Sequence, residues 1–397
     1  MYLTLATLAI FAFAYSTTVG RLERTPVNGA VVFVAFGLLA GPLGLGLLDL
    51  DVSGEGVRTI AELTLALVLF TDASSADLAV LRQTVRLPQR LLLLGLPLTI
   101  GLGFVAGTWL FPGLGMLEVA VLATMLAPTD AALGKAVVTN PKVPAKIREA
   151  LNVESGLNDG ICVPILFTFL ALASQAAEQS TGALALRLVA EEIGIGLVVG
   201  VGLSVAAAAT LRATARRGWL VDVWLGIPVV ALAFACFGLA QFAGGSGFIA
   251  CFAGGLTFGA MVRKHKQALL EGAEGTGEAF ALVTWVVFGA VVVSQPPGAF
   301  DWRVLVYAIL SLTVVRMLPV FVTVLGLGLR TDAKLFLGWF GPRGLASIVF
   351  LVIVFHEKLP GHETLAATTV ATVVLSIVAH GLTANPLAAA FAARTSR

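Results

Sequence analysis

The sequence predicts an all-α membrane protein of about 13 transmembrane helices, built as two inverted six-helix repeats. Three observations predict this fold class. The 397 residues are 58% hydrophobic and only 12% charged, about half the charged share of a soluble domain. Apolar runs of about 20 residues, the length that crosses a bilayer, recur along the chain. Two of these runs are interrupted by Pro at corresponding places in the two halves. A water-soluble fold is therefore excluded.

The expected helices follow one another with short connections and no appended soluble domain. They lie near residues 2–19, 27–48, 57–71, 90–111, 116–138, 147–173, 187–211, 219–240, 245–262, 277–295, 303–327, 333–355 and 364–386. The first run has no basic region before it and no small-residue cleavage site after it. It therefore predicts a membrane helix and not a signal peptide.

The connections between the expected helices alternate in charge. Eighteen of the 25 Lys and Arg residues fall in the odd-numbered connections and the C-terminus, and four fall in the even-numbered connections. Basic connections remain in the cytoplasm. We therefore expect the N-terminus outside and the C-terminus in the cytoplasm, which requires an odd number of helices. The net charge of only +2 predicts no nucleic-acid partner.

Two helix breaks indicate the inverted repeats. The fifth run contains Ala-Pro-Thr-Asp at residues 127–130, and the twelfth contains Gly-Pro-Arg-Gly at residues 341–344. One offset of seven helices relates both the breaks and the starts of the two halves, and an odd offset inverts a repeat. Runs one to six and eight to thirteen are thus the expected repeats, with residues 187–211 as the connector. Broken helices at such an interface are typical of transporter substrate sites.

Few ionisable residues lie inside the expected helices, where each costs about 2.5–3.5 kcal/mol to insert. They are Glu62, Asp130, Lys135, Glu154, Asp159, Arg316 and Arg343. We expect Glu154 to pair with one of the two arginines, because an unpaired buried charge is costly. Glu62 and Lys135 lie nearer helix ends, and we expect their side chains to extend to water.

The sixth run contains the most polar stretch of any apolar segment, residues 151–160. Helical geometry stacks Asn158 one turn from Glu154, and Asp159 one turn from Ser155. A hard monovalent cation such as Na⁺ needs oxygen ligands and partial charge neutralisation, which Asp159, Ser155 and the Thr129 carbonyl can supply. A proton can compete for Asp159, since a low dielectric favours the protonated carboxyl. We expect Asn158 to hold the broken fifth helix through Thr129.

The residues in the breaks leave alternatives open. Asp130 is expected to be a ligand or an N-cap of the second half-helix. Arg343 is expected to stabilise the C-terminal ends of the half-helices or to pair with an acid. The three cysteines, Cys162, Cys236 and Cys251, lie in apolar runs without CxxC spacing. They predict neither a disulfide nor a zinc site, and nothing in the sequence indicates a cofactor.

Five motifs occur in a characteristic order. They are Ala-Pro-Thr-Asp at 127–130, Glu-Ser-Gly-Leu-Asn-Asp at 154–159, Arg316 in Val-Val-Arg-Met-Leu, Gly-Pro-Arg-Gly at 341–344, and His380-Gly381-Leu382-Thr383. With them, nearly the whole chain resembles the monovalent cation/proton antiporter superfamily, in particular its sodium/proton exchanger branch of the NhaP and NHE kind. The resemblance implies the NhaA-like antiporter fold.

The resemblance also implies how the chain works. It implies a homodimer, a dimerisation part at about 1–85 and 219–300, and an ion-translocating core at about 86–185 and 301–390 that moves in an elevator-like cycle. Asp159 would be the transported-ion carboxylate, Asn158 its neutral neighbour, Ser155 and Thr129 ligands, and Glu154 the partner of Arg316. The Asn-Asp pair resembles electroneutral exchangers of one sodium or lithium ion per proton. We expect such a protein in a prokaryotic cytoplasmic membrane.

Other functions remain open at this stage. Potassium could replace sodium, and a cation channel could also line its pore with polar residues from broken helices. A further alternative is an intramembrane serine protease that uses Ser246, within Gly-Gly-Ser-Gly, and His380. A Gly-Ser-Gly cluster is more often a helix-packing surface. The protease alternative also leaves Asp159, Glu154 and the buried arginines unexplained.

Overall fold

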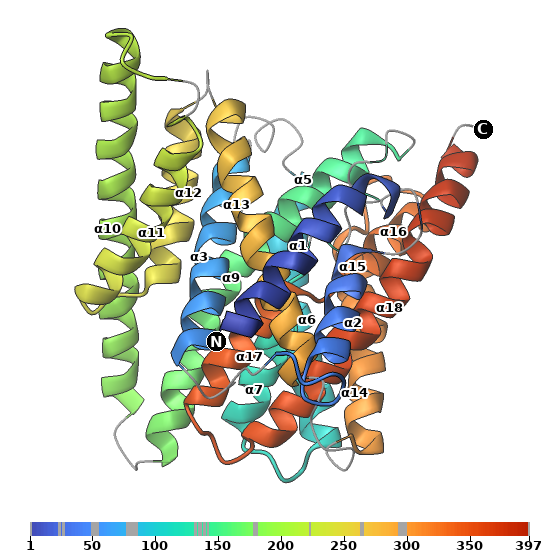
Figure 1. The fold of residues 1–397 in the computed structure, drawn as a ribbon. Coiled ribbons are helices and arrows are strands. Elements are labelled where there is room, and N and C mark those ends of the chain that lie inside the picture. The colour runs from blue at the N-terminus through green and yellow to red at the C-terminus, as the bar shows by residue number, and fades with distance from the viewer. Residues whose placement is uncertain are drawn as a thin grey trace. The chain divides into compact units, whose positions relative to one another are not determined.

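The computed structural model describes residues 2–22, 25, 28–48, 55–76, 86–130, 133, 137, 140, 143–177, 182–221, 224–262, 266–292 and 300–395. Within these residues the regular structure is helical, with no strand (Figure 1). The chain divides into two compact units. Unit 1 comprises Met1–Thr59, Thr84–Asn158 and Ala281–Arg397, and unit 2 comprises Ile60–Gln83 and Asp159–Phe280.

Unit 1 holds both ends of the chain and both expected helix breaks. Its helices are α1 (Tyr2–Leu22), α2 (Gly29–Ala40), α5 (Arg86–Arg90), η1 (Leu91–Gly95), α6 (Leu96–Leu110), α7 (Met116–Met125), the first part of α9 (Ala145–Ala177), η3 (Phe288–Val292), α14 (Trp302–Leu312), α15 (Val314–Thr323), α16 (Thr331–Trp339), α17 (Leu345–His356) and α18 (His362–Thr395). The π-helix η1 joins α5 to α6 without interruption, so Arg86–Leu110 forms one apolar span.

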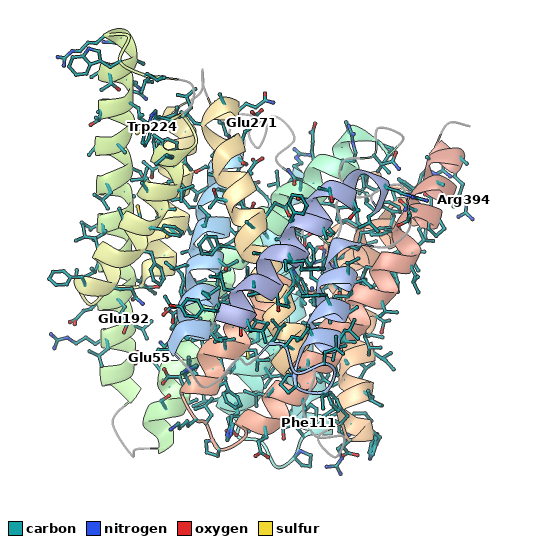
Figure 2. All side chains as sticks on the ribbon, viewed as in Figure 1. Glu55, Phe111, Glu192, Trp224, Glu271 and Arg394 are labelled. Carbon is teal, nitrogen blue, oxygen red and sulfur yellow. The ribbon has the colours of Figure 1, made fainter. Side chains whose placement is uncertain are left out.

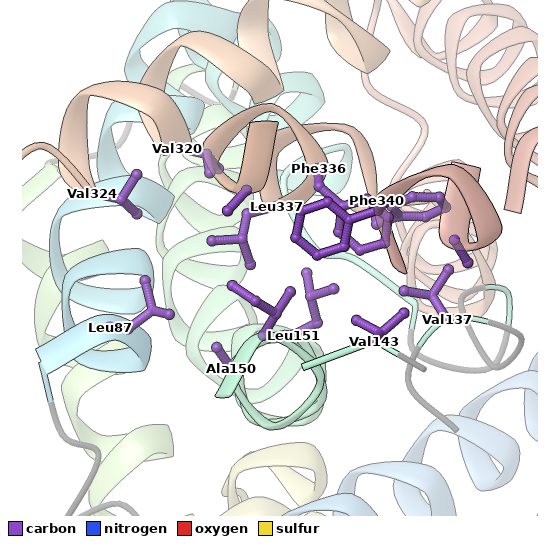
Figure 3. Close-up of a cluster of buried hydrophobic side chains, with 14 of the residues drawn as sticks. Leu87, Val137, Val143, Ala150, Leu151, Val320, Val324, Phe336, Leu337 and Phe340 are labelled. Atoms are coloured by element: carbon purple, nitrogen blue, oxygen red, sulfur yellow. The ribbon is translucent and has the colours of Figure 1, made fainter. Parts of the chain in front are cut away.

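Apolar side chains fill one end of unit 1. Leu151 of α9 lies against Phe336 and Leu337 of α16 in a cluster of buried side chains (Figure 3). Phe336 also stacks on Phe391 of α18, with ring centroids 4.3 Å apart. The cluster joins α9, α16 and α18, and it therefore fixes the helix that precedes the second break.

Unit 2 contains most of α3 (Glu55–Ser75), the remainder of α9, α10 (Gly182–Arg216), α11 (Ile227–Phe242), α12 (Gly247–Met261) and most of α13 (Lys266–Val287). Helices α10 and α12 pack directly on each other. A Cβ at Gly200 would clash with the backbone of Ala250, so only glycine permits this approach. Small residues at helix contacts are the usual means of packing in membranes, where the hydrophobic effect does not bring helices together.

The lengths and surfaces of the helices suit a bilayer. Among the described residues, six helical spans are long and apolar enough to cross a membrane, and five shorter apolar helices accompany them. Val198 of α10 is 73% exposed and Phe13 of α1 is 72% exposed, as expected of side chains that face lipid. Figure 2 shows Phe111 and Arg394 at opposite ends of unit 1. The chain is a multi-pass membrane protein.

Each expected apolar run overlaps a helix or a pair of helices, but several ends were predicted wrongly. Helix α13 begins at Lys266 and not near 277. Helix α2 ends at Ala40 and not near 48, because Pro42 cannot donate to a continuing helix. Helix α11 begins at Ile227 and not near 219, with Pro228 in its first turn, where its missing N–H costs nothing. Helix α18 continues past 386 to Thr395 despite Pro386. The number of membrane crossings and the inverted repeats stay predictions, as does the division into dimerisation and core parts.

Candidate functional site

Two broken helices meet in unit 1. Helix α7 ends at Met125 and is followed by the first break, residues 126–130, which are not helical. Helix α16 ends at Trp339, and the second break, residues 340–344, precedes α17. Each break contains a proline, which removes a backbone donor and disfavours helix at the residue before it. The amide of Asp130 donates to the carbonyl of Pro342 at 2.8 Å, so the two breaks lie side by side.

Asp130 caps a helix across this crossing. Its Oδ2 accepts from the amide of Leu345, the first residue of α17, at 2.9 Å, and its Oδ1 accepts from the amide of Leu133 at 3.2 Å. A carboxylate at a helix N-terminus satisfies free N–H groups and complements the helix dipole. The sequence suggested a cap of its own half-helix or a ligand. The structure shows that the cap also serves the opposite broken helix.

Arg343 donates hydrogen bonds to backbone carbonyls of both breaks. Its Nη1 donates to the carbonyl oxygens of Ala127 at 3.1 Å, Pro128 at 3.2 Å and Gly341 at 3.3 Å. The side chain is fully buried. These carbonyls lie at helix C-terminal ends, where partial negative charge accumulates. These contacts support one of the two roles expected for Arg343, the stabilisation of half-helix ends.

Glu154 and Arg316 form a buried ion pair between α9 and α15. Arg316 Nη2 donates to Glu154 Oε2 at 2.8 Å, and Nη1 donates to the second carboxylate oxygen. Both side chains are only 2% exposed. A two-point contact of this kind is the strongest geometry for a guanidinium and a carboxylate. Of the two buried arginines, Arg316 is therefore the partner of Glu154. Gly341 of the second break lies directly against the Arg316 guanidinium.

Polar side chains of α9 meet the first break one turn beyond this pair. Asn158 Nδ2 donates to Thr129 Oγ1 at 2.7 Å, and Thr129 Oγ1 lies 3.1 Å from Ser155 Oγ. All three side chains are buried, and Asp159 follows Asn158 directly in the helix and is 7% exposed. The expected bond from Asn158 to Thr129 is confirmed. Asn158 Oδ1 accepts no hydrogen bond from the described residues, which leaves it available to a ligand.

Two other charges, Glu62 and Lys135, were also predicted inside the helices. Glu62 is half-buried on α3 in unit 2, and Lys135 lies outside the described residues. No cluster of three or more His, Cys, Asp or Glu side chains that could hold a metal occurs in the described part of the chain. Cys162, Cys236 and Cys251 are all buried.

Sequence reasoning missed two serines that contact the breaks. Ser347 of α17 donates to the carbonyl of Met125, the last residue of α7, at 2.8 Å. Ser376 of α18 accepts from the amide of Arg343 at 2.7 Å. Both lie in long apolar runs, and a hydroxyl in such a run is the signal that could have indicated them. Their contacts satisfy backbone groups that the breaks leave without helical partners.

Comparison with known proteins decides the family. A family model described as sodium/hydrogen exchanger, transmembrane, matches residues 7–390. The chain belongs to this family. A K(+)/H(+) antiporter NhaP2 of Shewanella oneidensis is 24% identical over 374 residues, which cover 90% of this chain and 62% of the relative. A Na(+)/H(+) antiporter of Schizosaccharomyces pombe is 27% identical over 259 residues, covering 60% of this chain and 54% of the relative. The chain thus spans less than two thirds of the length of these exchangers.

Solved structures confirm the exchanger fold. The sodium proton antiporter MjNhaP1 of Methanocaldococcus jannaschii at pH 8 matches with a TM-score of 0.75 and 18% identity, over 96% of this chain and 98% of that one. An electron-microscopy structure of the same antiporter matches with a TM-score of 0.80 and 17% identity, over 99% and 98% of the two chains. At this level of identity the likeness establishes the fold alone.

Membership in an exchanger family argues against the protease alternative. Ser246 falls in the expected run 245–262, but it is the N-cap of α12, where its Oγ accepts from the amide of Ile249 at 3.4 Å. Gly244, two residues earlier, has φ +76°, which ends the helix before it. His380 lies in the middle of α18 and is 1% exposed.

Proposed function

We propose that this exchanger-family chain is a secondary-active antiporter that exchanges one sodium or lithium ion for one proton. The observation that carries the proposal is the meeting of Thr129, Ser155 and Asn158 next to Asp159, at the crossing of two broken helices. Hydroxyl, amide and carboxylate oxygens are the ligands that hard cations prefer. The cation is the substrate here and not a resident cofactor.

The proposal gives each ligand a role. Asp159 supplies the negative charge, Ser155 and Thr129 supply hydroxyl or carbonyl oxygens, and the Asn158 amide oxygen is buried with no hydrogen bond from the described residues. Asp130 is a weaker candidate ligand, since both of its carboxylate oxygens accept backbone hydrogen bonds. Glu154 carries no transported charge in this proposal, because Arg316 neutralises it.

Exchange follows from competition at Asp159. Its carboxylate can hold a cation or a proton but not both, so binding of one releases the other. If the site opens to one side of the membrane and then to the other, each full cycle moves one cation one way and one proton back. Since Asn158 is neutral, no second acid travels with the site. The exchange is therefore expected to move no net charge, and the membrane potential should not alter its rate.

The assembly and location that we propose accompany this mechanism. The chain would act as a homodimer in a prokaryotic cytoplasmic membrane, with its N-terminus outside. The core at about 86–185 and 301–390 would move against a dimerisation part at about 1–85 and 219–300, with residues 187–211 between them. The crossing supports this division, because its hydrogen bonds and the Glu154–Arg316 pair all join residues of the proposed core.

Potassium/proton exchange is the second candidate. Several relatives are named K(+)/H(+) antiporters, and about a quarter of the aligned positions are identical between them and this chain. A K⁺ ion is larger than Na⁺ and would need longer distances to the same ligands. The choice between the two cations therefore depends on ligand spacing around Asp159, which a transport assay measures directly.

The test is proton flux in proteoliposomes that hold the purified protein and an imposed pH gradient. Sodium, lithium and potassium are added separately, each at two clamped membrane potentials. The proposal expects sodium and lithium to dissipate the gradient at a saturable rate that the potential does not change. Dissipation by potassium alone would establish the second candidate instead. Flux that follows the potential and needs no counter-ion would identify a channel.

A further inference from the structure

A buried histidine lies behind the second break and touches none of the proposed ligands. His380 of α18 is 1% exposed, and both of its ring nitrogens have close polar neighbours. Nε2 lies 2.9 Å from the carbonyl oxygen of Trp339, the last residue of α16. Nδ1 lies 3.2 Å from Ser376 Oγ and 2.9 Å from the Ser376 carbonyl oxygen. An apolar side chain would fill the same space without these contacts.

The direction of the hydrogen bonds around His380 depends on which ring nitrogen carries the hydrogen. The carbonyl oxygens of Trp339 and Ser376 only accept, and His380 donates to Trp339 in the tautomer with the hydrogen on Nε2. The backbone amide of Arg343 only donates, so Ser376 Oγ accepts from it at 2.7 Å. The Ser376 hydroxyl hydrogen is then free to point to Nδ1. In this arrangement His380 holds the end of α16 through its own hydrogen bond to Trp339. It also orients Ser376, which accepts a hydrogen bond from the backbone amide of Arg343.

These contacts lead to the proposed cation site. Arg343 is held through its backbone by Ser376, and its Nη1 donates to the carbonyls of Ala127 and Pro128. Those residues directly precede Thr129, whose hydroxyl contacts Ser155 and Asn158. Hydrogen bonds thus connect His380 with the carbonyl of Pro128, the peptide bond continues to Thr129, and every member lies in unit 1.

We propose that His380 is a positioning residue of the transport site: with Ser376 it fixes the second break, and through Arg343 it sets the place of Thr129. The role in transport rests on the proposed function, whereas the fixing of the break does not. Helix breaks leave backbone groups without partners, and a precise site needs them held by neighbouring side chains. A displaced Thr129 weakens cation binding more than it slows the cycle.

Three variants separate this role from packing. In His380→Leu an apolar side chain of similar bulk removes both polar contacts. In His380→Gln the amide nitrogen takes about the place of Nε2 and can restore the bond to Trp339. Ser376→Ala removes the link to the Arg343 amide. We expect His380→Leu and Ser376→Ala to raise the KM for the cation about two- to tenfold, the range that one net hydrogen bond supports. The maximal rate should stay within about twofold of the wild type.

The proposal expects His380→Gln to recover part of the affinity that His380→Leu loses. It also expects the double variant His380→Leu/Ser376→Ala to lose less affinity than the two single losses combined, because part of the effect of His380 passes through Ser376. If His380→Leu leaves KM unchanged, or if Gln is no better than Leu, His380 acts by packing alone and the proposal is wrong.

Amide hydrogen exchange tests the positioning independently of transport. Peptides that cover residues 340–345 should exchange faster in Ser376→Ala and His380→Leu than in the wild type, while peptides within 350–354 should not change. Unchanged exchange at 340–345 would overturn the proposal. If the wild type moves no protons in response to any cation, the proposed function fails, but the exchange data still decide whether His380 and Ser376 fix the break.

Discussion

Glu154 and Arg316 neutralise each other inside the protein through two N–H to oxygen contacts, one of 2.8 Å between Arg316 Nη2 and Glu154 Oε2. Both side chains are 2% exposed. Removal of one partner leaves the other charge buried in a region of low dielectric. The pair consequently acts as a fixed link between α9 and α15, which keeps the helix that carries Ser155 and Asp159 against the second break.

We expect Glu154→Ala or Arg316→Ala to lower the free energy of unfolding by about 3–5 kcal/mol, the usual cost of an unpaired buried charge. The exposed pair of Arg187 and Glu191, with side chains 76% and 52% exposed, provides the control. Arg187→Ala should change stability by at most about 1 kcal/mol. Thermal unfolding in detergent measures both. Equal effects of Arg316→Ala and Arg187→Ala would contradict the structural role.

Gly344→Ala should impair transport. A Cβ at this position would overlap the Asp130 carboxylate and displace it from the amide of Leu345, which would uncap α17. Gly238 of α11 has open space around its Cβ position, so Gly238→Ala is the matched control and should keep full activity. Comparison of the two variants in the proton-flux assay checks the expectation. Full activity in Gly344→Ala would mean that the Asp130 cap is dispensable.

Ser155→Ala and Thr129→Val should each raise the KM for the cation. Each removes an oxygen beside Asp159, and the loss of one hydrogen-bonding or ligating group costs about two- to tenfold in affinity. Thr168, on the same helix as Ser155, bonds to the carbonyl of Pro164 and to no proposed ligand among the described residues. Thr168→Val is therefore the control and should behave as the wild type. An unchanged KM in Ser155→Ala would remove this side chain from the ligand set.

Much of the site could be predicted from the sequence, because burial of its charged residues in a membrane helix costs free energy. Asp159, Glu154 and the two arginines lie in apolar runs, and a buried charge requires a partner or a use. The breaks were predicted from Pro128 and Pro342 because proline interrupts the backbone hydrogen bonds of a helix. These local rules located both the crossing and the ion pair that unit 1 contains.

Other features could not be predicted, since they depend on which segments meet in space. The amide of Leu345, 215 positions from Asp130 along the chain, is the group that Asp130 caps. No spacing rule reports that contact. The hydrogen bond from the Arg343 amide to Ser376 likewise depends on which segments meet in space. The helix ends near Pro42 and Pro228 were predicted wrongly, because the apolar runs extend beyond the residues at which the helices end or begin.

Asn158→Asp should reduce the exchange rate. The substitution places a second acid beside Asp159, and it also removes the amide that donates to Thr129 Oγ1 at 2.7 Å. Two neighbouring carboxylates in a low dielectric do not both ionise easily. We expect the remaining flux to stay independent of membrane potential, which the proteoliposome assay at two clamped potentials measures. A fast, potential-dependent variant would show that the neutral Asn158 alone sets the stoichiometry.

The most direct test of the account is cation-driven proton flux in Asp159→Asn. Wild-type protein, Asp159→Asn and the control Asp301→Asn are reconstituted at equal amounts with a pH gradient. Asp301 is an exposed N-cap of α14, and asparagine caps a helix as well as aspartate does. The account predicts sodium-driven dissipation in the wild type and Asp301→Asn and none in Asp159→Asn, with all three proteins folded. Sodium-driven exchange that persists in Asp159→Asn would contradict the assignment of the transport site.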